Sequence, residues 1–122
     1  MPDTREGADG RPDHPPQSCG GGETEQVKDA RELALITTIL RELREVPGVV
    51  VRKRHGTGWG FAGDPDLYGS INGRHFEIEV KRPRAPLTKL QRYRLDEWRQ
   101  AGAITGIAHS VYDALRILNI AS

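Results

Sequence analysis

The sequence predicts an α/β fold: a small mixed β-sheet flanked by helices, with the element order α-β-β-β-α-β-α. Three features of the chain favour it. An amphipathic helical pattern ends at Pro47-Gly48, two alternating strand patterns flank Asn72-Gly73, and a helix is followed by an apolar strand at 88–108. The last pattern is long enough to be a crossover that pairs two strands in parallel, whereas the Asn-Gly turn joins antiparallel strands. The sheet should therefore be mixed.

The first helix is expected to run from near Thr24, a suitable N-cap, to the breaker pair that starts at Pro47. Apolar residues at helical spacing should form its buried face: Val27, Ala30, Leu33, Ala34, Leu40 and Leu43, widened by Ile36 and Ile39. The β-branched run that follows, 49–53, favours a strand.

The next two strands are expected at 66–71 and 75–81, joined by the Asn72-Gly73 turn. Because side chains alternate along a strand, one face of the second strand suits the core and the other carries Glu77, Glu79 and Lys81. Glu77 is expected to be solvated. The tight hairpin should bring the carboxylate of Asp66 beside that of Glu79.

The rest of the chain supplies the second half of the fold. A basic, proline-containing loop at 82–86 leads to a helix at 88–101 that begins at Thr88 and places Trp98 in the core. A buried strand at 103–108 and a last helix at 111–118, capped by Ser110, complete the order.

Composition limits the organisation and the environment. The chain has 122 residues, enough for one small domain, which we place at 25–122 after a disordered, acidic tail rich in Gly and Pro at 1–24. Its single cysteine, Cys19, excludes an internal disulfide framework. There is no signal-peptide pattern and no apolar run long enough for a bilayer, so we expect a cytoplasmic protein without a membrane partner.

The charge is distributed unevenly. Residues 1–26 carry two Arg and six Asp or Glu, for a net charge of −4, and residues 27–122 carry 16 Lys or Arg and 11 Asp or Glu, for a net charge of +5. A basic domain favours nucleic acid as a partner. The candidate contacts are Arg52, Lys53, Arg54 and His55 before the glycine-rich loop, and Arg82 and Arg84 after the hairpin. The alternative for the first group is a solvated strand end.

The paired acids suggest a metal site. Mg²⁺ (or Mn²⁺) takes oxygen ligands, and Asp66, Glu79 and the backbone carbonyl of Val80 can supply them. Such an ion acts as a Lewis acid on a phosphate and lowers the pKa of its bound water. Lys81, two residues beyond Glu79 on the same face, can stabilise developing charge or orient the attacking water.

Pro65-Asp66 followed by Glu79-x-Lys81 resembles the PD-(D/E)xK nuclease motif. The longer ordered set resembles the VRR-NUC branch of that superfamily, over about residues 28–118: Gly63-x-Pro65-Asp66-Leu67, then 79–83, then Leu87-Thr88 with Gln91, then Ala101-Gly102 and an apolar strand. Such domains occur in phage proteins and in structure-specific DNA repair nucleases. The resemblance implies a restriction-endonuclease-like core.

The resemblance also implies roles. Asp66 and Glu79 are metal ligands, Lys81 is the catalytic lysine and Gln91 points toward the site. A further acid comes from the first helix, either Glu32 or Glu25. The implied activity is metal-dependent hydrolysis of DNA phosphodiesters, with branched DNA such as a Holliday junction as a substrate and a homodimer as the assembly that cuts it. The alternative is a non-catalytic nucleic-acid-binding module on a nuclease scaffold.

Overall fold

The centre of the fold is a hairpin of two strands, β2 (Leu67–Ile71) and β3 (Arg74–Val80). Its turn residues, Asn72 and Gly73, have φ angles of 49° and 88°, the left-handed backbone that a two-residue turn between twisted strands requires. The computed structural model describes residues 28–55 and 60–120. The predicted hairpin is confirmed.

The sheet has four strands in the order β1-β2-β3-β4, where β1 is Val49–Lys53 and β4 is Ile104–Ala108. The β1–β2 and β2–β3 pairs are antiparallel, and β3 and β4 are parallel. The mixed sheet and the element order predicted from the sequence are therefore confirmed.

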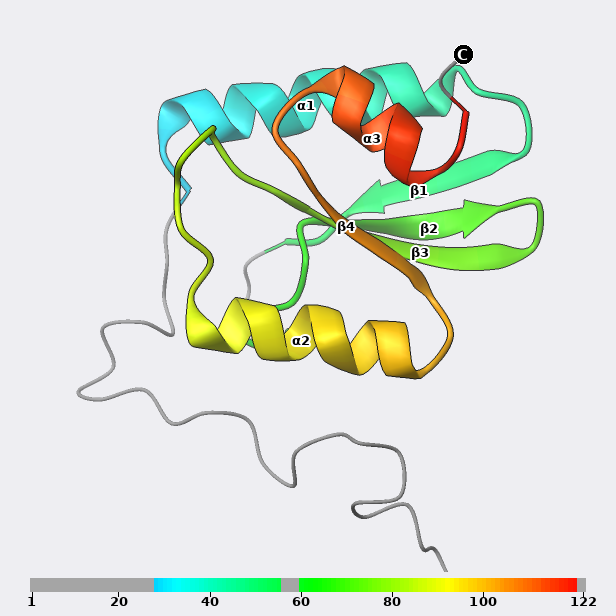
Figure 1. The fold of residues 1–122 in the computed structure, drawn as a ribbon. Helices are drawn as coiled ribbons and strands as arrows, with labels where there is room; N and C mark the ends of the chain where they lie inside the picture. Colours follow the sequence, from blue (N-terminus) through cyan, green and yellow to red (C-terminus); the bar gives the residue numbers. More distant parts are fainter. Residues whose placement is uncertain (1–27, 56–59, 121–122) are drawn as a thin grey trace, which may run out of the picture.

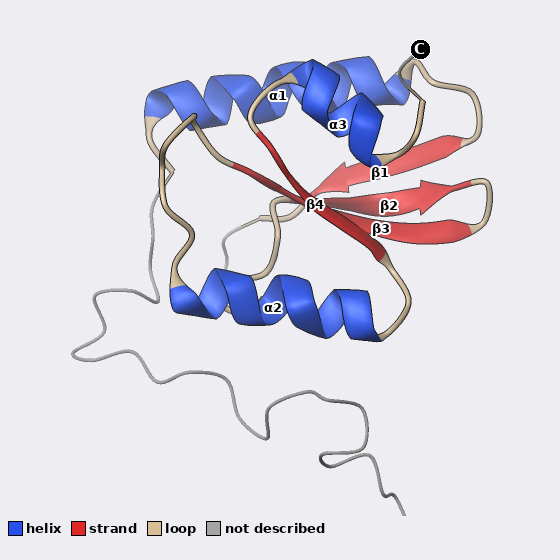
Figure 2. Cartoon of the chain, viewed as in Figure 1, coloured by secondary structure: helices blue, strands red, loops and turns tan. Residues whose placement is uncertain are grey.

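Helices cover both faces of the sheet (Figures 1 and 2). α1 (Ala30–Arg44) and α3 (Val111–Ile117) lie on one face, and α2 (Lys89–Gln100) lies on the other. The main apolar core lies between the sheet and the first pair of helices; its largest side chains include Phe76, Ile36, Ile39, Leu43, Leu67 and Ile78. β3 is consequently buried on both faces from Phe76 to Val80.

The start of α1 and part of its buried face differ from the prediction, which is confirmed for Ile36, Ile39 and Leu43. The helix begins at Ala30 and not near Thr24, because the Asp29 side chain accepts a hydrogen bond from the backbone N–H of Glu32 and caps the helix there. Leu33 is 44 % exposed, and the alanines predicted beside it are exposed as well. The row that faces the sheet is Glu32, Ile36, Ile39 and Leu43, about a quarter-turn away from Leu33.

Several predictions lie outside the described residues, namely the disordered tail at 1–24 and the residues Cys19, Glu25 and Val27. Within 28–55 and 60–120, no helix has the length and apolarity that a bilayer crossing requires.

Candidate functional site

Two carboxylates lie side by side at the open end of the hairpin, the end opposite the turn. Leu67 lies opposite Ile78 in the antiparallel register, which brings the preceding Asp66 alongside Glu79. Asp66 Oδ2 accepts a hydrogen bond of 2.8 Å from the backbone N–H of Val80. This bond fixes the Asp66 carboxylate at the end of β3, as the alternation and the Asn-Gly turn predicted.

A lysine that the sequence analysis did not single out lies between the two acids. Lys28 Nζ is 2.8 Å from Glu79 Oε2 and 3.2 Å from Asp66 Oδ2, and it donates a 2.6 Å hydrogen bond to the carbonyl oxygen of Val80. The side chain of Lys28 is only 12 % exposed. One cation is therefore already surrounded by the three oxygens predicted as metal ligands.

The electrostatics of this cluster are unusual. Burial raises the pKa of Glu79 to about 7, the negative charge of Asp66 acts in the same direction, and the two nearby lysines, Lys28 and Lys81, oppose it. Burial by itself lowers the pKa of Lys28, but the charges and hydrogen bonds of Glu79 and Asp66 outweigh it and raise that pKa above its ordinary value. The Lys28 side chain is accordingly held as a cation.

Lys81 follows directly after β3 and is 1 % exposed. Its backbone is fixed on both sides, because its N–H donates to the Ala108 carbonyl at 3.0 Å and its own carbonyl lies 2.9 Å from Nδ1 of His109. Burial lowers the pKa of Lys81, as does the positive charge of Lys28, against the opposing effect of the acids. A lysine with a lowered pKa in a polar cluster is typical of functional sites.

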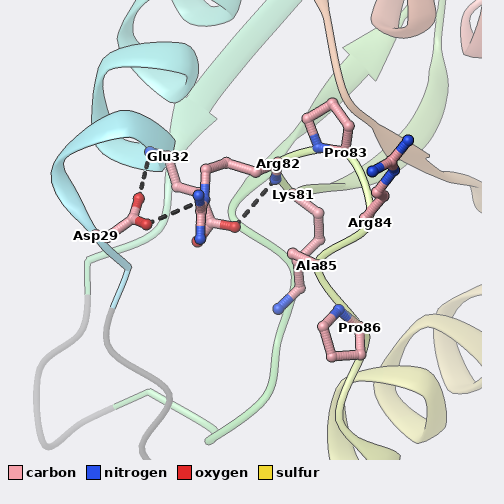
Figure 3. A pocket seen from close by; sticks show the side chains of 8 residues that line it. All are labelled: Asp29, Glu32, Lys81, Arg82, Pro83, Arg84, Ala85 and Pro86. Atoms are coloured by element: carbon pink, nitrogen blue, oxygen red, sulfur yellow. Dashed lines mark hydrogen bonds and ion pairs between the residues drawn. The ribbon is translucent and has the colours of Figure 1, made fainter.

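Glu32 reaches the site from the first turn of α1. Its Oε2 accepts a 3.0 Å hydrogen bond from the backbone N–H of Arg82, and its Oε1 lies 3.9 Å from Lys28 Nζ. Figure 3 shows this bond together with the pairing of the Arg82 guanidinium with Asp29, at 3.0 Å. α1 is thus attached to the chain that leaves β3. Glu32, one of the two acids predicted from the first helix, lies beside the cluster, and the other, Glu25, is outside the described residues.

A pocket of about 430 Å³ opens beside these groups. Its lining combines the start of α1 with the chain that follows β3: Asp29, Glu32 and residues 81–86 (Figure 3). Both charges are present in the lining, which includes the cationic residues Lys81, Arg82 and Arg84 and the acids Asp29 and Glu32. The pocket provides a polar recess next to the paired acids.

Gln91 is buried, with 6 % exposure, in the first turn of α2. Its side-chain Oε1 accepts from the Thr88 N–H and its N–H donates to Thr88 Oγ1, both at 3.0 Å. This reciprocal capping box starts the helix. The geometry therefore gives Gln91 a structural role at the beginning of α2, and its predicted direction toward the acids stays a prediction.

The oxygens of Asp66, Glu79 and the Val80 carbonyl fit a Mg²⁺ or Mn²⁺ ion that keeps part of its water shell. Across 28–55 and 60–120, no three His, Cys, Asp or Glu side chains form a group that could hold a metal. Two carboxylates and one carbonyl do converge, because they already share the Lys28 ammonium. Hard cations bound by one or two carboxylates, with water or phosphate completing the shell, need no more than this.

The second acid on this face of β3 belongs to a different network. Glu77 is fully buried, so the prediction that it is solvated is wrong. Arg54 binds its two carboxylate oxygens at 2.6 and 3.1 Å, and His75 Nε2 lies 2.6 Å from Oε2. The Arg54 guanidinium stacks over the rings of Tyr68 and Trp98, at 4.5 and 5.7 Å from their centres.

Trp98, on α2, packs against this network and partly shields it from solvent. It is half-buried, whereas a core position was expected, and its indole N–H donates to Asp64 Oδ1 at 3.2 Å. Its ring lies 5.0 Å from that of His75. α2 thereby covers the Arg54–Glu77 pair. This cover explains why Glu77 is inaccessible to water although its neighbours on this face are polar.

The residues predicted to contact nucleic acid differ in their exposure to solvent. Arg54 is held inside by Glu77 and by the Pro65 carbonyl, at 2.8 Å, which accounts for its side chain without DNA. Arg52, His55 and Arg84 are exposed, and Lys53 and Arg82 are half-buried. Arg82 and Arg84 line the pocket and lie closest to the acids along the chain.

Comparisons with known proteins support the predicted fold. No protein-family model and no curated protein matches the chain. A solved structure described as a VRR_NUC domain superposes with a TM-score of 0.59 at 23 % identity, over 74 % of this chain and 96 % of that one. The chain thus has the fold of a VRR_NUC domain, the fold that the order of motifs predicted.

Proposed function

We propose that this chain is a metal-dependent endonuclease that hydrolyses phosphodiester bonds in DNA. The observation that carries the proposal is the convergence of Asp66 Oδ2, Glu79 Oε2 and the Val80 carbonyl on one cation. The fold shared with a VRR_NUC domain and the resemblance of the motif order support it. The buried Lys81 on the same face adds the third side chain of the motif.

Each residue has a role that follows from its position. Asp66, Glu79 and the Val80 carbonyl would hold Mg²⁺ or Mn²⁺, which when bound supplies Lewis-acid activation of the phosphate and a lower pKa for water. The Val80 N–H keeps the Asp66 carboxylate directed at the site. Lys81 Nζ stabilises the charge that develops on the phosphate or orients the attacking water. Glu32 holds the Arg82 backbone, and with it the wall of the pocket.

The substrate side of the proposal rests on charge. Residues 27–122 carry a net charge of +5, and the exposed Arg84 with the half-buried Arg82 lies beside the pocket. Phosphate contacts from such residues position DNA without reading its sequence. Branched DNA, cut by a homodimer with two symmetrical sites, is the more specific form of the proposal. Sedimentation velocity tests it, and a monomer on a bound junction would contradict the dimer.

The experiment is a cleavage assay on a labelled four-way junction, a flap, a nicked duplex and a single strand. Cleavage is expected with Mg²⁺ or Mn²⁺ and not with a chelator. Asp66→Asn and Lys81→Met should each reduce the rate by at least about a hundredfold, the usual effect of removing a group that stabilises the transition state. Asp96→Asn and Lys89→Met, on the outer surface of α2, are the matched controls and should cut normally.

The outcomes separate the two functions considered for this fold. Cleavage that survives both Asp66→Asn and Lys81→Met would refute the assigned roles. Binding of the panel by fluorescence anisotropy with no cleavage on any substrate, in either metal, would instead favour the non-catalytic binding module.

A further inference from the structure

Lys28 contacts one oxygen of each of the three groups proposed as metal ligands. We propose that its ammonium group competes with the divalent cation for these oxygens, so that Lys28 sets the metal affinity of the site and must leave when the metal enters. This inference rests on the metal site of the proposed function. It assigns a role to a residue that belongs to none of the nuclease motifs in the chain.

On the three oxygens that Lys28 contacts, the two cations are mutually exclusive. Lys28 Nζ lies 2.6 Å from the Val80 carbonyl, 2.8 Å from Glu79 Oε2 and 3.2 Å from Asp66 Oδ2. A magnesium ion binds oxygen at about 2.0–2.1 Å. An ion that shares these three oxygens would therefore lie within the volume of the ammonium group. Binding is an exchange of one cation for another.

The charges of the cluster favour that exchange. Glu32, Asp66 and Glu79 bring three negative charges when ionised, and Lys28 and Lys81 bring two positive ones, so the cluster carries −1 (−3 + 2). A divalent ion added beside both lysines would give +1, whereas the same ion in place of Lys28 gives 0 (−3 + 1 + 2). Departure of Lys28 thus leaves the buried cluster neutral, which is the less costly state in a low dielectric.

The backbone permits Lys28 to leave. Lys28 precedes the N-cap Asp29 and lies outside α1. The start of the helix is held independently, by the Asp29 cap on Glu32 and by the pairing of Asp29 with Arg82. Rotation of the Lys28 side chain away from the acids breaks none of these bonds. The exchange is therefore a local side-chain movement.

The test measures Mn²⁺ binding directly, by electron paramagnetic resonance titration of the full chain at fixed salt and pH. Lys28→Met is expected to bind Mn²⁺ about tenfold more tightly than the wild type, because the site is no longer occupied by its internal competitor. Lys89→Met, which removes an exposed lysine at the start of α2, should leave the affinity unchanged. Asp66→Asn added to Lys28→Met should abolish the gain.

Thermal unfolding distinguishes competition from a simple structural ion pair. Without metal, Lys28→Met should have a lower Tm than the wild type, since Asp66 and Glu79 then repel each other with one counter-charge fewer. Saturating Mn²⁺ should raise the Tm of Lys28→Met more than that of the wild type. If the metal-free variant does not fold at all, Mn²⁺ should restore a cooperative transition.

Three results would overturn the inference in different ways. Unchanged or weaker Mn²⁺ binding by a folded Lys28→Met, while the wild type binds, would remove the role of Lys28 and leave the proposed function intact. No Mn²⁺ binding by the wild type or by Lys28→Met would remove the metal site itself. An equal loss of Tm with and without Mn²⁺ would show that Lys28 is only a structural partner.

Discussion

Three charged residues, two on one face of β3 and one directly after the strand, are almost completely buried. Glu77, Glu79 and Lys81 are 0 %, 1 % and 1 % exposed. Charged side chains are seldom buried without partners, and the two acids have different ones: Glu77 pairs with Arg54, and Glu79 pairs with Lys28. One strand face thus holds a structural ion pair at one end and a candidate reaction centre at the other.

The Arg54–Glu77 pair should contribute to folding and not to chemistry. Glu77→Ala leaves a guanidinium without its carboxylate beneath α2, and we expect it to lower the free energy of unfolding by about 3–5 kcal/mol. Urea denaturation followed by circular dichroism measures this change. Glu42→Ala, at an exposed position of α1, is the control and should stay within about 0.5 kcal/mol. A Glu77→Ala protein as stable as the control would contradict the assignment.

The sequence predicts the core of the site from local rules but misses its tertiary parts. A period of two and an Asn-Gly turn suffice to place Asp66 beside Glu79. Lys28 is spaced four residues before Glu32, which predicts contact with Glu32 alone; its contact with Glu79 depends on how α1 docks on the sheet. Glu77 was predicted to be solvated because the sequence of the strand does not indicate that α2 packs over it.

At the scale of elements, β2 tolerates no side chain at one position. A Cβ on Gly69 would lie 1.9 Å from the Val50 carbonyl oxygen of β1 and 2.9 Å from Cζ of Phe76 in β3. Both neighbours are fixed, one by the ladder and the other by the core. Gly69 therefore allows β1, β2 and the Phe76 ring to pack closely, on the hairpin that carries the two acids.

Gly69→Ala should accordingly lower the free energy of unfolding by about 1–3 kcal/mol, as overpacking does. Gly73→Ala is the informative comparison, because its Cβ meets nothing within 4 Å and only its φ of +88° is unfavourable, at a cost of about 1 kcal/mol. Urea denaturation of both variants ranks them. A Gly69→Ala protein that is the more stable of the two would show that the strands can move apart.

Element boundaries followed from capping residues where one candidate stood out. Thr88 and Ser110 cap α2 and α3 as predicted. The start of α1 was predicted too early because several polar residues precede the helix and could cap it. The choice of Asp29 over Thr24 depends on a tertiary contact, the ion pair of Asp29 with Arg82 in the chain that follows β3. Helical periodicity also allowed two apolar rows, and only docking on the sheet selected the row of Ile36 and Ile39.

At the scale of the molecule, the basic surplus of residues 27–122 predicts salt-dependent DNA binding. Arg84→Ala should weaken binding to all sequences alike and reduce the slope of log K against log salt by about 0.9, as loss of one phosphate contact does. Fluorescence anisotropy from low to moderate salt measures the slope. Arg41→Ala, exposed on α1, is the control, and an equal effect of both variants would place the DNA elsewhere.

The contacts of the site span very different lengths of chain. Asp66 and Val80 are 14 residues apart, whereas Lys28 and Glu79 are 51 apart. Contacts between distant residues close a longer loop at a higher entropic cost, so the hairpin contact is the easier to form. On the ribosome, a nascent chain that ends before β3 contains Asp66 but not Glu79, Val80 or Lys81, so Lys28 lacks two of its three oxygen partners. The complete cluster of acids and lysines can therefore form only after synthesis has passed Lys81.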